Sequence, residues 1–304
     1  MCGIVGLFAK SPAIEDRLGE HLAAMLRQMS DRGPDSAGVA VYRDPVAHGH
    51  SKLVLCSPLA HEDWPALGHQ IGATGGPALR HNHALFTLPC APADAQARAE
   101  EHRPDLRVMS AGEVIEIYKE TGRPERFAEL FALGDVRGTH AIGHTRMATE
   151  SKVTTEGSHP FSTGEDLCLV HNGSLSNHNR LRENLRREGI RFVSENDTEV
   201  AAGYLAWRLR EGATLQQALE GCLDDLDGFY TFAVGTRDGF AVMRDPIACK
   251  PAVMAETDEW VAMASEYRAI AVLPGADTAR SWEPEPARVY VWERERERER
   301  ERVA

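Results

Sequence analysis

Short apolar stretches joined by turns constrain the fold of this 304-residue chain more than any other feature. Six of them follow residue 139: AIGH, LCLVHN, FYTFAVGT, FAVMRD, EWVAMASE and RVYVWE. Two helical patterns interrupt the series, at about 198–211 and 214–226, where apolar residues recur at three- and four-residue spacing. Strands joined by turns pair antiparallel, because a parallel pair needs a long crossover. The pattern predicts an α+β fold of antiparallel sheets with helices packed outside them.

The N-terminal residues fit the same picture. GIVGLFA (3–9) reads as a short buried strand, and a single apolar face predicts a helix over 14–29. The loop DRGPDSAG (31–38) leads into the strand-like VAVY.

Residues 44–135 have a broken apolar pattern, and we interpret them as an insertion within one domain that spans 2–292. Helices are predicted around EVIEIYKE and PERFAELFAL within this insertion. The last residues, 293–304, alternate Glu and Arg and predict a solvated helix or a disordered tail.

The composition excludes several classes of protein. Apolar residues make up 42% and charged residues 26%, and the net charge of -12 argues against a nucleic-acid partner. No apolar run approaches the roughly 18 residues that span a membrane, and no signal peptide is visible, so a cytoplasmic location is expected. The six cysteines form no CxxC pair, and the HGH and HNH stretches lack partner ligands. We therefore expect no metal site and no disulfide framework.

Cys2 and four further stretches contain the residue types needed for catalysis. The stretches are RGPDSAG (32–38), GHTRMAT (143–149), HNGSLSN (171–177) and ENDTEV (195–200). Each has a structural alternative when taken alone. Cys2 could be a small residue of a buried strand, the Asn-Gly pair a turn, and Asp197 a helix cap.

In this order behind Cys2, the stretches resemble the class II glutamine amidotransferases, which are N-terminal-nucleophile hydrolases. The resemblance covers residues 2–43 and about 138–292. It implies a four-layer αββα sandwich and the hydrolysis of glutamine to glutamate and ammonia.

The resemblance also implies the catalytic roles. Once Met1 is removed, the Cys2 thiol attacks the glutamine amide and forms a thioester. An α-amine has an ordinary pKa of about 8, so the amine of Cys2 can take the proton. The side chain of Asn172 and the backbone N–H of Gly173 occupy the positions that hold the oxyanion.

Three residues match the positions that bind glutamine. Arg146 corresponds to the carboxylate-binding arginine, Thr149 adds a hydroxyl contact, and Asp197 pairs with the ammonium group. The alternative for Arg146 is a surface salt bridge. Arg32 is expected to brace the N-terminus or to be purely structural, and His144 to orient its neighbours. RDPIACKP (244–251) and ASE (264–266) are expected to close the sheets around the site.

The sequence departs from the family pattern in two ways. Glu150 and Ser151 stand where a glycine commonly follows, and no ammonia-using segment follows the domain. We therefore expect a separate ammonia-accepting synthase subunit and a hetero-oligomer. The arrangement resembles the amidotransferase subunit of glutamate-synthase-like complexes, N-methylglutamate synthase in particular. That resemblance implies no cofactor in this chain, with flavin and iron–sulfur centres on partner subunits.

Three alternatives remain open from the sequence. The chain could hydrolyse another amide without an acceptor subunit, which activity on γ-glutamyl compounds but not on glutamine would reveal. It could be a catalytically silent regulatory subunit, which would bind glutamine without turnover. Cys2 could be purely structural, in which case Cys2→Ser would retain full activity.

Overall fold

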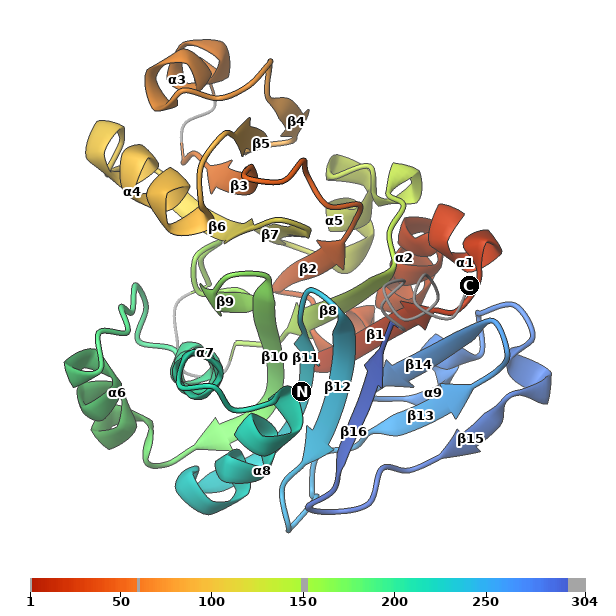
Figure 1. Ribbon diagram of the computed structural model, residues 1–304. Coiled ribbons are helices and arrows are strands. Elements are labelled where there is room, and N and C mark those ends of the chain that lie inside the picture. The colour runs from red at the N-terminus through yellow and green to blue at the C-terminus, as the bar shows by residue number, and fades with distance from the viewer. Residues whose placement is uncertain (1, 59–60, 149–152, 295–304) are drawn as a thin grey trace, which may run out of the picture.

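The computed structural model describes residues 2–58, 61–148 and 153–294, and its described strands form three sheets in which every pairing is antiparallel (Figure 1). The seven-stranded sheet has the order β15 (Arg280–Trp282), β13 (Val253–Glu256), β14 (Trp260–Ala264), β1 (Gly3–Ala9), β8 (His140–Arg146), β2 (Ser36–Tyr42) and β7 (Ile115–Thr121). The five-stranded sheet has the order β16 (Val289–Glu293), β12 (Gly239–Arg244), β11 (Gly228–Gly235), β10 (Leu167–Leu175) and β9 (Phe161–Gly164). The four-stranded sheet has the order β4 (Ala78–Arg80), β5 (His83–Leu88), β3 (Ser51–Cys56) and β6 (Arg107–Gly112).

The two larger sheets pack face to face, as the alternation along β10 shows. Cys168 and Val170 point into the core shared with the seven-stranded sheet, whereas Leu167 and Leu169 belong to a second core beneath α7. Residues two apart on a strand share a face, so β10 is buried on both sides. Helices cover the outer face of each of these two larger sheets, and the predicted αββα sandwich is confirmed.

Each helical layer follows from its sequence pattern. The helices α1 (Pro12–Asp16), α2 (Leu18–Gln28), α5 (Pro124–Leu130) and α9 (Tyr267–Ile270) lie on the side of the seven-stranded sheet. The helices α6 (His178–Arg187), α7 (Asp197–Arg210) and α8 (Leu215–Asp225) cover the five-stranded sheet. The predicted helices over 198–211 and 214–226 are confirmed as α7 and α8. The single helix predicted over 14–29 is wrong, because the chain breaks at Arg17 between α1 and α2.

The four-stranded sheet lies within residues 44–135 and has its own core. Helices α3 (Trp64–Ile71) and α4 (Pro92–His102) pack on it. The helix predicted around PERFAELFAL is confirmed by α5, but the helix around EVIEIYKE is wrong. That stretch is β7, which pairs with β2 from Tyr42↔Ile115 to Ser36↔Thr121.

The ends of the chain and two structural absences complete the description. Residues 295–304 of the predicted Glu/Arg tail lie outside the described residues. Among the described helices, none has the length and apolar character needed to cross a bilayer. Within the same part of the chain, no group of three or more His, Cys, Asp and Glu side chains is arranged to hold a metal ion.

Candidate active site

Cys2 lies just before β1, the central strand of the seven-stranded sheet, and is only partly buried. Two side chains from distant segments donate to its carbonyl oxygen. The Nε of Arg32 lies 3.0 Å from that oxygen and the Nδ2 of Asn172 lies 3.2 Å from it. The Cys2 thiol lies 3.9 Å from the carbonyl oxygen of Met147. Cys2 therefore lies outside the buried strand that follows it. Its carbonyl oxygen is held by two hydrogen bonds, and its thiol lies beside Met147, which follows β8.

Arg32 is held between Cys2 and a carboxylate. It ends the 3-10 helix Ser30–Arg32 and is 9% exposed. Its second contact is an ion pair of 2.6 Å to Glu266, in the ASE stretch. The hydrogen bond from Arg32 is the main cause that lowers the pKa of Glu266 below its ordinary value. The guanidinium is therefore held in one orientation beside Cys2.

Asn172 and Gly173 lie within β10, paired with Thr231 and Tyr230 of β11, so the interpretation of this pair as a turn is wrong. Gly173 has a φ of +150°, a conformation that side chains disfavour. A Cβ at this position would lie 1.9 Å from the carbonyl oxygen of Phe229. The backbone here therefore requires glycine.

Arg146 ends β8 and is 7% exposed, so the alternative of a surface salt bridge is wrong. The RGPDSAG loop fixes the backbone around it. The N–H of Asp35 donates to the carbonyl of Arg146 at 3.1 Å, and the carboxylate of Asp35 accepts from the N–H of Ala148 at 2.8 Å. Thr149, together with Glu150 and Ser151, lies outside the described residues.

Asp197 is the first residue of α7 but does not cap it. Asn196 is the N-cap, and its Oδ1 accepts from the N–H of Thr198 at 2.9 Å, so the interpretation of Asp197 as the cap is wrong. The Oδ2 of Asp197 accepts instead from the N–H of Leu175 at 2.9 Å. Its Oδ1 lies 3.7 Å from Nδ1 of His171. Through its hydrogen bond with Leu175, Asp197 links the start of α7 to the end of β10, two residues beyond Gly173.

His144 lies behind Asn172, in a cluster of buried imidazoles. Its Nε2 donates to the carbonyl of His171 at 3.1 Å, and its ring stacks on His159 with 4.0 Å between centroids. Burial lowers the pKa of His144 to about 3 and that of His159 well below the ordinary value. Both rings are therefore neutral at physiological pH.

Lys119 of β7 holds the segment that carries His159. Its buried Nζ donates to the carbonyl oxygens of Glu156, Ser158 and Pro160 at 3.1, 2.9 and 3.2 Å. Desolvation by burial lowers the pKa of Lys119 to about 8. Three carbonyl acceptors match the three donors of an ammonium group, and no carboxylate of the described residues forms an ion pair with this cation.

The structure brings together residues that are far apart in sequence. Arg32 and Asn172 each contact Cys2 directly. Arg146 follows Thr145, which pairs with Gly3. Asp197 reaches the same region through β10. A guanidinium and an amide side chain thus contact Cys2, and Arg146 and Asp197 lie on strand and helix ends connected to the same region.

Sequence reasoning missed four residues of this region as individual contributors: Asp35, His159, His171 and Thr198. Three of them belong to stretches already singled out, because Asp35 lies in RGPDSAG, His171 in HNGSLSN and Thr198 in ENDTEV. His159 had no comparable signal, since only the fold places its ring against His144.

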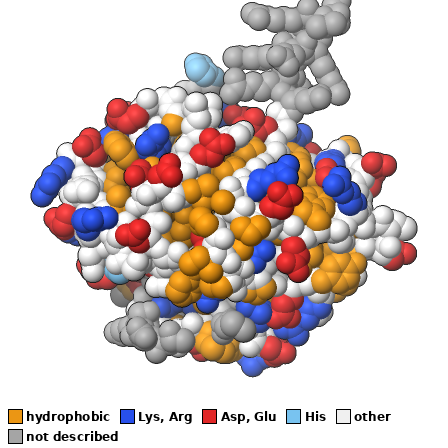
Figure 2. All heavy atoms as spheres, turned by 90° about the horizontal axis from the view of Figure 1, so that it is seen from below, with side chains coloured by type: hydrophobic (Ala, Val, Ile, Leu, Met, Phe, Trp, Pro, Cys, Tyr) orange, Lys and Arg blue, Asp and Glu red, His pale blue; other side chains and the backbone are white. Residues whose placement is uncertain are grey.

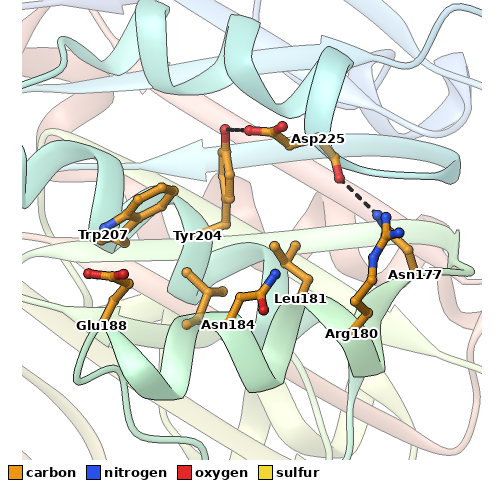
Figure 3. Close-up of a pocket in the computed structure, with 9 residues that line it drawn as sticks. Asn177, Arg180, Leu181, Asn184, Glu188, Tyr204, Trp207 and Asp225 are labelled. Carbon is orange, nitrogen blue, oxygen red and sulfur yellow. Dashed lines mark hydrogen bonds between the residues drawn. The ribbon is translucent and has the colours of Figure 1, made fainter.

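A separate groove of about 400 Å³ lies in the outer helical layer, between α6, α7 and the end of α8 (Figure 3). Leu181, Tyr204 and Trp207 line it together with polar side chains. Asp225 closes one side, where its carboxylate accepts from the Tyr204 hydroxyl and its carbonyl accepts from Asn177. The groove contains none of the predicted site residues.

Comparison with known proteins shows the family. A family model described as "Glutamine amidotransferase domain" matches residues 144–272. The chain is 55% identical over 294 residues to the glutamine amidotransferase-like protein GlxB of Rhizobium meliloti, covering 95% of this chain and 97% of that protein. The chain belongs to the class II glutamine amidotransferases.

Two further comparisons agree with this family. A putative glutamine amidotransferase of Methanothermobacter thermautotrophicus is 32% identical over 312 residues, which cover 95% of this amidotransferase and 99% of that protein. The glutamine phosphoribosylpyrophosphate amidotransferase of B. subtilis has a similar structure, with a TM-score of 0.59 at 20% identity. That similarity covers 96% of this chain and 47% of the B. subtilis chain, and it shows the shared fold.

Proposed function

We propose that the chain hydrolyses L-glutamine with Cys2 as the nucleophile and supplies the ammonia to a partner. One observation carries the proposal: Arg32 and Asn172, from segments 30 and 170 residues away, both donate to the carbonyl of Cys2. This arrangement fixes the residue that would become the N-terminus once Met1 is removed. Its thiol is left partly exposed to a substrate.

The proposed reaction proceeds through a thioester. The α-amine of Cys2 takes the thiol proton, and the thiolate attacks the amide carbon of glutamine. The C–N bond then breaks, and the amine returns the proton to the departing ammonia. Water adds to the thioester, releases glutamate and restores the thiol.

Asn172 and Gly173 are suited to stabilise the tetrahedral intermediates. An Asn side-chain amide has two N–H donors, and only one of those of Asn172 is used by the carbonyl of Cys2. The second N–H and the backbone N–H of Gly173 can both face an oxyanion. Because both groups lie on a paired strand, they are fixed before the substrate binds.

Arg146, Thr149 and Asp197 are proposed to select free glutamine. A guanidinium matches a carboxylate with two parallel hydrogen bonds, and a carboxylate matches an ammonium group. The burial of Arg146 strengthens such a pairing, because water competes less for the charge. A substrate that lacks either terminal charge would lose one of these contacts.

The ammonia acceptor is proposed to be a separate synthase subunit. Ammonia released into water is protonated and no longer reacts as a nucleophile, so it must be passed on within a complex. The relatives from R. meliloti and M. thermautotrophicus match this chain over 97% and 99% of their own lengths, which leaves no synthase domain within them. The resemblance to glutamate-synthase-like complexes supports a glutamate synthase or N-methylglutamate synthase partner, with flavin and iron–sulfur centres on the partner.

The test is the intact mass of the protein before and after treatment with a diazo-ketone analogue of glutamine. Loss of Met1 and one adduct mapped to Cys2 are expected. Cys249 is also exposed, so Cys249→Ser serves as the matched control and should still form the adduct. Retention of Met1, or an adduct confined to Cys249, would contradict the proposal. Turnover of γ-glutamyl compounds but not of glutamine would favour the alternative amidohydrolase.

A further inference from the structure

A chain of hydrogen bonds behind the candidate site joins His159, Thr198 and His171. The Oγ1 of Thr198 lies 3.4 Å from Nε2 of His159 and 3.0 Å from Nδ1 of His171. All three residues are more than nine-tenths buried, with exposed fractions of 6%, 1% and 4%. No solvent reaches these contacts freely, so the protein itself determines where each proton lies.

The direction of each hydrogen bond follows from the first one. The backbone N–H of His171 donates to Nδ1 of His159 at 3.4 Å, so this Nδ1 carries no proton. A neutral imidazole with a bare Nδ1 carries its proton on Nε2. The Nε2–H of His159 therefore donates to the hydroxyl of Thr198.

Thr198 has one hydroxyl hydrogen to donate, and two acceptors lie within reach. Nδ1 of His171 is at 3.0 Å and Oδ1 of Asp197 is at 3.5 Å. The shorter contact places the hydrogen on the His171 side, and the proton of His171 is then on Nε2. Nε2 of His171 has no hydrogen-bond partner among the described residues, so the contact between Nδ1 and the hydroxyl of Thr198 is what distinguishes the two ring nitrogens.

The tautomer of His171 decides what Asp197 can bind. Oδ2 of Asp197 already accepts from the N–H of Leu175. A proton on Nδ1 of His171, only 3.7 Å away, would face Oδ1 and share its lone pairs. We propose that Thr198 is a positioning residue, whose hydroxyl holds His171 as the Nε2–H tautomer and so keeps Oδ1 of Asp197 unshared. This inference rests on the proposed function, in which Asp197 binds the ammonium group of glutamine.

Nitrogen-15 NMR of histidine-labelled protein tests the tautomer directly, without turnover. The wild type and Thr198→Ser, which keeps the hydroxyl, should show His171 protonated on Nε2. Thr198→Val has the same shape but no hydroxyl, and it should show the proton on Nδ1. A wild-type His171 protonated on Nδ1 would overturn the inference even if the valine variant does not fold.

Steady-state kinetics then separates positioning from general damage. We expect Thr198→Val to raise KM for glutamine about tenfold while kcat changes less than about twofold, because ground-state binding is what is lost. Thr198→Ser should restore the wild-type KM. A folded valine variant with an unchanged KM contradicts the inference. If the wild type itself does not hydrolyse glutamine, the proposed function fails. The NMR comparison still decides whether Thr198 determines the tautomer of His171.

Discussion

The side-chain amide of Asn172 donates a hydrogen bond of 3.2 Å to the carbonyl oxygen of Cys2, across 170 residues of sequence. This contact joins the two central sheets, because Cys2 precedes β1 and Asn172 lies in β10. The contact therefore fixes the position of Cys2, the candidate nucleophile, relative to β10, the strand proposed to stabilise the oxyanion.

Asn172→Ala should lower kcat for glutamine hydrolysis by about 10²–10³-fold, since it removes one of the two proposed oxyanion donors. The matched control is Asn177→Ala, in the same HNGSLSN stretch. Asn177 bonds to the backbone of Asp225 and Asp227, away from Cys2, so its loss should lower the melting temperature with little change in kcat. Equal kcat losses in both variants would contradict the assignment.

Arg32→Lys should lower kcat by about 10–100-fold, because the one ammonium nitrogen of a lysine cannot occupy both positions, Nε and Nη1, from which Arg32 bonds Cys2 and Glu266. Arg268→Lys is the control, because Arg268 pairs with Glu266 at 2.8 Å but makes no hydrogen bond or ion pair with Cys2 among the described contacts. Kinetics and melting temperatures of the two variants check this. A similar fall in kcat for Arg268→Lys would show that Arg32 acts only through Glu266.

Gly173→Ala should destabilise the native state by about 3 kcal/mol or more, through the disfavoured φ and the overlap with the Phe229 carbonyl. Gly76→Ala is the control, because a Cβ there meets no atom within 4 Å and its φ is not in the disfavoured range. Urea unfolding of both variants measures the difference. A stable alanine variant at position 173 would mean that the strand can adjust around this residue.

Stability should fall as the pH drops below about 6.5, because buried histidines stay neutral in the native state. Burial lowers the pKa of His83, His140 and His144 to about 3, whereas an unfolded imidazole protonates near 6.5. Between these values the unfolded state binds more protons, so each histidine removes about 1.4 kcal/mol of stability per pH unit as the pH falls. Urea unfolding at several pH values checks the slope. His140→Asn should reduce the slope by one histidine's share, and an unchanged slope would contradict the prediction.

The fold class was predictable because most strands of the two large sheets are joined by turns and carry recognisable apolar stretches. The failure at EVIEIYKE has a physical cause. Four successive residues of β7 are buried: Ile115, Glu116, Ile117 and Tyr118. β7 is covered by the four-stranded sheet as well as by the core of the seven-stranded sheet to which it belongs. A strand buried on both faces loses its alternation, and its apolar spacing then resembles that of a helix.

The site was predictable as a set of stretches, but not in its supporting contacts. Nothing in the sequence indicates that Glu266 meets Arg32, 234 residues away. The assignment of a helix cap also depended on local geometry, since Asn196 and Asp197 are adjacent and both can cap. Thr149 is the one predicted site residue that lies outside the described part of the chain.

The pairing of β2 with β7 shows where the four-stranded sheet is inserted in the sequence. Tyr42, the last residue of β2, pairs with Ile115, the first of β7, so residues 43–114 occupy the tip of what is otherwise a β-hairpin. Arg146 pairs with Ser36, at the opposite end of β2. Extra length at a hairpin tip leaves the register of its strands unchanged. The segment can therefore grow, shrink or be exchanged in evolution while the end of the sandwich that holds the candidate site keeps its geometry.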